Sequence, residues 1–239
     1  MFSTLPALAN ASSIKPAAEP QPVIPDSFIR AETDRMFAGI TQRSGGINKL
    51  WKVRRPVALD QQPVIRINRD TLYIGAVVDT EGGASFTLPE MPEMPEMPDD
   101  RYSSVMMIDN DHYTSQVIYV PGTYQIAQDT KYVLVGARFH IKDPQDEAEI
   151  QLLNQLQDQF VITANNTDLL RAYIWDLTSL QELRSGYESE FQQLDQYASD
   201  WMGPRGKVNE ETRHLASAGA WGLLPEQDAT YINYSGHHD

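Results

Sequence analysis

The chain reads YSSVMMIDNDHYTSQVIYVPGTYQIAQDTKYVLVGARF over residues 102–139. Short runs rich in Val, Ile, Tyr and Thr are separated there by turn-forming residues, which is the pattern of β-strands joined by tight turns. Asp109-Asn110-Asp111 and Pro121-Gly122 mark two of the turns. Because no helical period lies between the runs, the pattern predicts an antiparallel sheet and disfavours parallel βαβ units.

The same pattern extends back to residue 64. It predicts strands near residues 64–68, 72–79, 84–88, 102–108, 112–120, 123–127 and 131–139. Strands spaced this closely predict an antiparallel β-sandwich or a barrel-like domain over about residues 60–140. A three-residue Met-Pro-Glu or Met-Pro-Asp repeat interrupts the block at residues 91–99, and we interpret it as an expanded hairpin loop.

Helical periodicity lies on both sides of the β block. Before it, a helix beginning at Asp26 or Ser27 is predicted to end at Gly45-Gly46. After it, Asp143 is placed to cap a second helix and Asn209 to cap a short last one. Between these two, one apolar stripe keeps a spacing of three or four residues: Leu177, Leu180, Leu183, Tyr187, Phe191, Leu194, Tyr197 and Trp201.

The fold class predicted from these patterns is α+β, with four segments along the chain. They are a signal remnant and Pro-rich linker (1–25), a helix with the antiparallel β domain (26–142), a helical segment (143–220) and an apolar C-terminal tail (221–239). Ala9-Asn10-Ala11 has the small residues of a signal-peptidase site, so we expect export to the periplasm or the medium, with the start of the signal truncated. An ordinary Ala/Pro/Ser-rich tail is the alternative.

Charge and composition limit the partners. The formal net charge is −14, and residues 143–200 hold twelve acidic and two basic residues. Such a surface repels phosphate backbones, so we expect no nucleic-acid partner. The chain has no cysteine, which excludes disulfides and thiolate chemistry. No apolar run reaches the roughly 18–20 residues that cross a bilayer, so no transmembrane segment is expected.

Familiar catalytic signatures are missing from the sequence. It contains no G-x-S-x-G elbow, phosphate loop, dinucleotide fingerprint or H-E-x-x-H helix. We therefore predict no cofactor and no metal site, and treat His237-His238 as an adventitious metal binder at most. The sequence leaves open whether the chain is an enzyme.

Three groups of polar residues are nevertheless candidates for a ligand site. Asn68, Arg69, Asp70 and Tyr73 place a guanidinium, which suits a carboxylate or phosphate, beside a carboxylate that could orient it. An Arg–Asp pair that braces a turn is the structural alternative.

The other two candidates are His112 and Arg138. His112 follows two aspartates and could be a general base with a raised pKa, or else a surface histidine beside turn-capping acids. Arg138 interrupts an apolar strand and needs a partner if it is buried.

Short elements recur in a fixed order and carry a resemblance. They are Arg30-Ala31-Glu32-Thr33-Asp34, Asn68-Arg69-Asp70-Thr71-Leu72-Tyr73, Ile108-Asp109-Asn110-Asp111-His112-Tyr113, Pro121-Gly122-Thr123-Tyr124, Tyr132-Val133-Leu134-Val135, and Trp221-Gly222 with Pro225 and Asp228-Ala229-Thr230-Tyr231. As a set they resemble the bacterial family catalogued as domain of unknown function 1254. The resemblance implies export, β-sandwich units with a helical portion, and a following β-rich region, catalogued as domain of unknown function 1214. It implies no reaction.

Two functional hypotheses follow. The first is a site in the β domain for a small polar or anionic organic molecule, built from Asn68, Arg69, Asp70, Tyr73, His112 and Arg138. The second is a non-catalytic structural or interaction module. Because the chain ends about where the second family region would begin, we expect an incomplete family member. Its apolar tail, residues 221–234, would then be covered by self-association or by a separate β-domain partner.

Overall fold

The computed structural model describes residues 19–58, 68–90, 102–166, 170, 173–194 and 197–231. Four sequence predictions lie outside these residues: most of the strand at 64–68, the repeat at 91–99, the signal-like site at 9–11 and the terminal histidines. The other six predicted strands are present within two residues of their expected ends.

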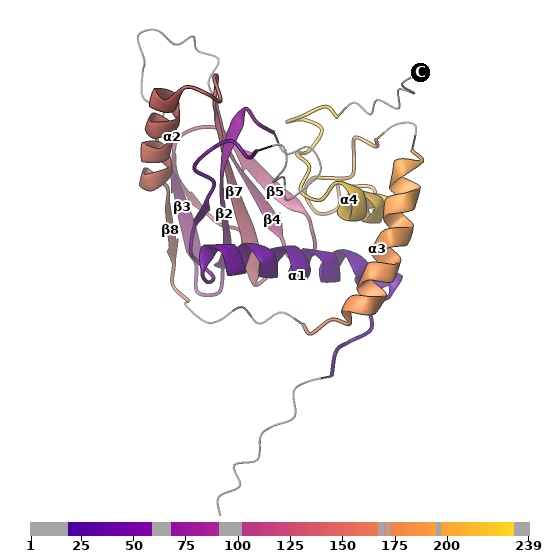
Figure 1. The fold of residues 1–239 in the computed structure, drawn as a ribbon. Helices are drawn as coiled ribbons and strands as arrows, with labels where there is room; N and C mark the ends of the chain where they lie inside the picture. The colour runs from indigo at the N-terminus through magenta and orange to yellow at the C-terminus, as the bar shows by residue number, and fades with distance from the viewer. Residues whose placement is uncertain are drawn as a thin grey trace, which may run out of the picture.

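Two antiparallel sheets form the centre of the fold (Figure 1). One has the strand order β1-β2-β7-β4-β5 and the other β6-β3-β8. The strands are β1 (Trp51–Lys52), β2 (Thr71–Asp79), β3 (Ala84–Leu88), β4 (Ser103–Asp109), β5 (Thr114–Ile118), β6 (Gly122–Gln125), β7 (Tyr132–His140) and β8 (Val161–Ala164). The antiparallel prediction is confirmed, and neither sheet closes on itself among the described residues, so the barrel-like alternative is wrong.

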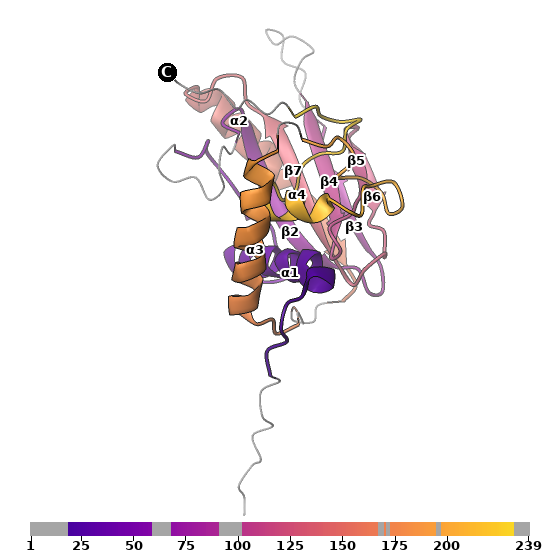
Figure 2. The ribbon, with the colours of Figure 1, turned by 90° about the vertical axis from the view of Figure 1, so that its right-hand side faces the viewer.

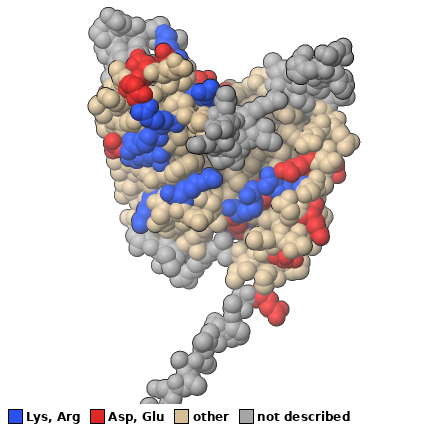
Figure 3. All heavy atoms as spheres, viewed as in Figure 1, with Lys and Arg blue, Asp and Glu red and all other residues tan. Residues whose placement is uncertain are grey.

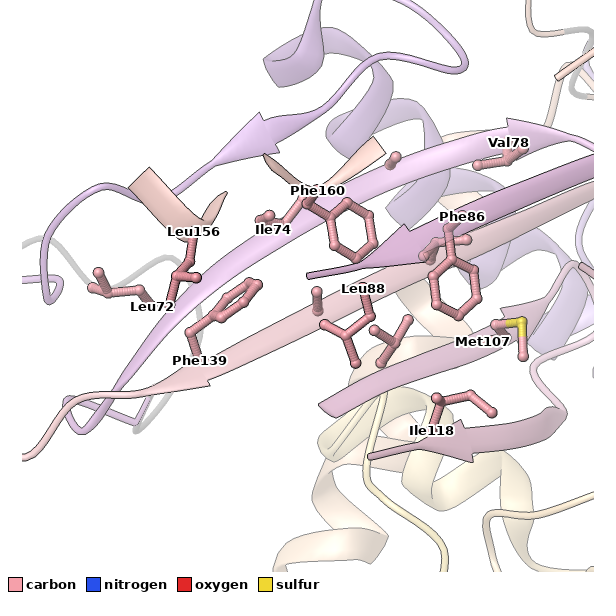
Figure 4. Packing of buried hydrophobic residues seen from close by; sticks show 14 of the residues in the cluster. Leu72, Ile74, Val78, Phe86, Leu88, Met107, Ile118, Phe139, Leu156 and Phe160 are labelled. Carbon is pink, nitrogen blue, oxygen red and sulfur yellow. The ribbon is translucent and has the colours of Figure 1, made fainter. Parts of the chain in front are cut away.

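The main core lies between the two sheets. Phe86 of β3 and Phe139 of β7 are almost fully buried there, together with Phe160 (Figure 4). Helix α2 (Glu147–Gln159) closes the same core with Leu153 and Leu156. Burying a side chain of this size contributes ~1.5–3 kcal/mol, so this layer supplies much of the driving force for folding.

The opposite face of the five-stranded sheet is covered by helix α1 (Pro25–Ser44). Phe37 and Ile40 of α1 pack with Val77, Met106 and Leu134 of the sheet. The sheet is thus buried on both faces, which explains why β2 and β4 lack an apolar–polar alternation. The predicted C-terminus of the helix is confirmed, because Gly45 takes the left-handed conformation with φ 78°.

Helices α3 (Leu177–Gln192) and α4 (Arg213–Gly219) pack on α1 and on each other (Figure 2). Leu180 and Ala218 contact the α1 residue Phe28, and Phe191 and Leu215 form a further cluster with Trp201. The aromatic stripe predicted from Leu177 to Trp201 is therefore core at Leu180, Phe191 and Trp201, whereas Leu177 at its start is 68% exposed. Its helix ends at Gln192, however, and Trp201 reaches the core from a non-helical segment.

Two further boundaries differ from the sequence predictions. Asp146 rather than Asp143 caps α2, because its carboxylate accepts hydrogen bonds from the backbone N–H groups of Ala148 and Glu149. The segment predicted as helical over 143–220 also contains a strand, since β8 leaves the end of α2 and pairs with β3. None of the helices in the described part of the chain is both long and apolar enough to cross a bilayer.

The acidic charge of residues 143–200 is unevenly compensated. Asp158 and Glu147 of α2 pair with the basic side chains Lys52, Arg54 and Arg55. Blue and red side chains accordingly lie together at the α2 corner in Figure 3, whereas red predominates along α3. The acidic surface that the sequence predicts for residues 143–200 therefore lies mainly on the α3 side of the molecule in this view.

Candidate functional site

Tyr73 and Arg138 come together on neighbouring strands. They are directly opposite each other in the β2–β7 ladder, and the guanidinium carbon of Arg138 lies 6.0 Å from the centre of the Tyr73 ring. Their side chains are on the face that α1 covers further along, where Gly75 packs under Ile40. Figure 1 shows α1 crossing one end of this sheet. The pair lies two residues beyond Gly75 and Gly136, on the side away from the end that pairs Asp79 with Tyr132.

Two more tyrosines extend this pair across the sheet. Ser104 of β4 is opposite Arg138, and Tyr119 follows the end of β5 at the same level. Tyr102 precedes β4 and stacks on His140, with ring centres 5.6 Å apart. We call Tyr73, Arg138, Tyr102 and Tyr119 the arginine–tyrosine row. Tyr102 and Tyr119 are nearly half exposed, so the row is open to ligands.

The cation of the row forms no ion pair with any residue that the structure describes. Arg138 is half-buried, and among the described residues it has neither an ion-pair partner nor a hydrogen-bond acceptor. Burial raises the pKa of Tyr73, and burial with a hydrogen bond to Asp228 raises the pKa of Tyr119 to about 12. Both phenols therefore stay protonated at neutral pH. The Tyr119 hydroxyl donates its proton to Asp228, so Tyr73 is the phenol that can donate to a ligand.

Asn68, Arg69 and Asp70 lie at the same end of the sheet as the row. All three are exposed, and the backbone carbonyl of Asp70 accepts a hydrogen bond from the N–H of Ile141. The turn-bracing alternative is not found, since Arg69 makes no ion pair within the described residues. Asp70 instead accepts a hydrogen bond from the Thr71 hydroxyl.

His112 lies at the other end of the sheet. It belongs to the β4–β5 turn, beyond Asp109, which pairs with Val133 of β7. Arg138 is five residues along β7 from that pair, about 16 Å at the rise of a strand. The six candidates therefore do not form one site: His112 is separated from the other five.

The chemical expectation for His112 is also wrong. The residue is buried rather than at the surface, and burial together with the neighbouring Arg213 lowers its pKa to about 3. The raised pKa expected from the adjacent aspartates does not occur, because those carboxylates turn away. Asp109 accepts hydrogen bonds from the backbone N–H groups of Asp111 and Tyr113, and its other oxygen binds Arg205.

A neutral His112 holds the tail against the fold. Its Nε2 accepts a hydrogen bond from the Gly222 N–H, and its Nδ1 lies 2.7 Å from the hydroxyl of Ser217 on α4. The imidazole stacks on Trp221 with ring centres 4.9 Å apart. Through these contacts two of the family elements, residues 108–113 and Trp221-Gly222, form one structural unit.

The described part of the tail folds back on its own chain. Trp221 and Leu224 pack against the α1 side of the sheet, and Leu223 packs against the cluster around Phe191. Ile232 and Tyr234, which also motivated the expected partner, lie outside the described residues. Self-association stays a prediction.

Sequence reasoning missed a second polar centre beside this turn. Arg30, Arg205 and Arg213 all converge on Asp111, whose carboxylate binds the first two and whose backbone carbonyl binds the third. Arg30 is far in the sequence from Arg205 and Arg213, and all three are far from Asp111; only the ordered family elements hinted at Arg30. No cluster of three or more His, Asp or Glu suited to a metal ion is found in the part of the chain that the structure describes.

Comparison with known proteins places the chain in a family. A solved structure, the VPA0106 protein from Vibrio parahaemolyticus, is 15% identical, with a TM-score of 0.46; the match covers 84% of this chain and 54% of that one. This chain thus spans about half the length of that protein. No curated protein matches it. Residues 47–165 match the family model described as "Protein of unknown function (DUF1254)", and through them the chain belongs to this family.

Proposed function

We propose that the chain binds a small organic anion at the arginine–tyrosine row. The observation that supports this is the half-buried guanidinium of Arg138, which lacks a carboxylate partner among the described residues. An unpaired cation in partly desolvated surroundings costs free energy, and an anionic ligand would repay that cost. A carboxylate is the ligand group that matches the planar fork of arginine.

The tyrosines determine which kind of anion fits. The Tyr73 ring already contacts the Arg138 guanidinium, and its hydroxyl is a neutral donor. Tyr102 and Tyr119 add exposed aromatic surface on the same side. A planar organic carboxylate would contact the rings while its charge binds Arg138. No nucleophile with an adjacent base lies in the row, so we propose binding without assigning a reaction.

The test is calorimetry with benzoate and its neutral analogue benzamide. We expect benzoate to bind and benzamide to bind at least about tenfold more weakly, since hydrogen bonds to charged groups contribute ~1.5–3 kcal/mol. Arg138→Gln should remove the difference while leaving the thermal midpoint nearly unchanged, because no ion pair is lost. Arg55→Gln, which removes an exposed arginine beside α2, should change nothing. Equal affinity of wild type and Arg138→Gln for benzoate would refute the proposal.

An interaction module remains the second candidate function, and a specific patch favours it. Ile24, Ile174 and Leu177 are each about half exposed or more. They lie together because the backbone of Gln21 hydrogen bonds to Ile174 and Asp176. Leu177→Asp should abolish any dimer detected by light scattering after size exclusion. A monomer in the wild type at high concentration would exclude this patch as a self-association surface.

We also propose that the protein is exported. The support is the Ala9-Asn10-Ala11 element followed by a Pro-rich stretch. N-terminal sequencing of the protein made from its native locus tests this. A cytoplasmic protein that retains Met1 would contradict it.

A further inference from the structure

A pocket of about 460 Å³ lies at the opposite end of the molecule from the arginine–tyrosine row. It is partly open to solvent and lies between the start of α1, the β4–β5 turn, α3, α4 and the segment before α4. Its lining includes the charged residues Asp26, Arg30 and Arg205 and the aromatic residues Tyr113, Tyr187 and His214. The volume is within the range of ~300–1,000 Å³ typical of small-molecule sites.

One side of the pocket is basic and rigid. The guanidinium carbons of Arg205 and Arg213 each lie close to the Tyr113 ring, 4.1 and 4.0 Å from its centre. The Tyr113 hydroxyl donates to Glu210, which fixes the ring. Arg205 uses only Nη2 to bind Asp109 and Asp111, so Nε and Nη1 have no partner within the described residues. These nitrogen atoms are donors available to a carboxylate.

The other side of the pocket is acidic and aromatic. The rings of Tyr187 and His214 lie 4.4 Å apart, one from α3 and one from α4. Asp26, at the start of α1, lines the pocket together with this ring pair. Burial raises the pKa of Tyr187, and the charges of Glu190 and Asp26 raise it further. Asp26 is exposed and has no hydrogen-bond or ion-pair partner in the described part of the chain. A carboxylate beside aromatic rings suits an ammonium group.

The basic and acidic side chains that line the pocket balance one another, which favours neither a bare anion nor a bare cation. Arg30 is paired with Asp34 and Asp111, and Arg213 lies within 3.5 Å of Glu210. Arg205 is paired with two aspartates as well. A bare anion would therefore meet no net positive field, and a bare cation would meet the basic wall. A molecule that carries both charges matches both sides.

We propose that this pocket binds a zwitterion of amino-acid to dipeptide size. Its carboxylate lies against Arg205 and Arg30, and its ammonium lies against Asp26 beside the Tyr187–His214 ring pair. The proposal does not rest on Arg138, because the two sites occupy opposite ends of the five-stranded sheet.

The probe is the dipeptide glycyl-L-phenylalanine, measured by calorimetry at neutral pH beside two blocked forms. The N-acetyl form lacks the ammonium, and the C-terminal amide lacks the carboxylate. We expect the parent dipeptide to bind with a millimolar or tighter dissociation constant and each blocked form to bind at least about tenfold more weakly, a loss typical of one charged hydrogen bond. Absence of binding by the parent, or equal binding of either blocked form, would overturn the proposal.

One variant tests whether the dipeptide binds in this pocket. Asp26→Asn removes an exposed carboxylate without a described partner, so the fold should survive. The substitution should weaken binding of the parent dipeptide by about tenfold and leave binding of the N-acetyl form unchanged, because only the parent carries an ammonium. Glu182→Gln, an exposed acid on α3 outside the pocket, is the matched control and should bind like wild type. If Asp26→Asn bound the parent dipeptide as tightly as wild type, the ammonium would not lie against Asp26. Arg138→Gln should bind the dipeptide like wild type, because Arg138 belongs to the other site.

Discussion

Lowering the pH should weaken the fold through His112. Its pKa is about 3 in the folded chain and 6.5 in a model peptide, because burial and the neighbouring Arg213 disfavour the charged form. The unfolded chain therefore binds a proton that the folded chain does not. Stability from this group is complete above pH 6.5 and is lost as the pH falls through that value towards 3. The full difference corresponds to ~4–5 kcal/mol, a large fraction of the stability of an ordinary domain.

Other groups act in the same pH range with the opposite sign. Burial raises the pKa of Asp34 and of Asp109, so the folded state binds protons there more readily than the unfolded state. These carboxyls contribute stability as the pH falls, which would mask part of the effect of His112. The experiment therefore compares wild type with His112→Asn, which cannot titrate. Asparagine tolerates the left-handed backbone that His112 adopts at φ 63°.

Urea denaturation at several pH values, followed by tryptophan fluorescence, gives the free energy of unfolding of both proteins. At neutral pH the variant should be less stable by ~1–3 kcal/mol, because the Gly222 N–H loses its acceptor. The gap should shrink or reverse as the pH falls below 6.5, at about 1.4 kcal/mol per pH unit at most. Parallel curves for wild type and His112→Asn would refute the reasoning.

Two smaller predictions concern a glycine contact and a phenol. Gly219→Ala should cost ~1–3 kcal/mol in urea denaturation, because its Cβ would lie 2.4 Å from the Phe191 ring. Gly186→Ala, with open space at an exposed position of α3, should instead stabilise by ~0.5–1 kcal/mol; a loss at both positions would contradict the packing argument. Asp228→Asn should lower the pKa of Tyr119 from about 12 in ultraviolet titration, although burial, the larger cause, should keep it above that of a free phenol.

Local signals along the sequence were sufficient to locate most elements. Gly82-Gly83 adopts positive φ values between β2 and β3, and Gly45 does so at the end of α1. A residue with this freedom is required at such a turn whatever the rest of the chain does, so its effect can be read from the sequence. Arg138 is a candidate from the sequence because a charge within an apolar strand is conspicuous, and Tyr73 is one because it ends a cluster of polar residues.

Residues that meet only in the folded state could not be assigned in the same way. Asp146 caps α2 although Asp143 offers the same side chain, and β8 follows α2 because β3 has a free edge to pair with. The pocket shows the limit most clearly, because Arg30 contacts the turn from one distant part of the chain and Arg205 and Arg213 contact it from another. No local pattern encodes such a meeting.

The sequence by itself determined the α+β class, the strand positions and the family, because propensity, turn chemistry and short motifs are local properties. Tertiary structure alone determined the chemical state of His112. Two aspartates next to it in the chain suggested a raised pKa, but both turn away to bind backbone N–H groups and arginines. The imidazole is left against Arg213 and Trp221 in a dry core. A pKa depends on distance and solvation in three dimensions, so neighbours in the sequence did not predict it.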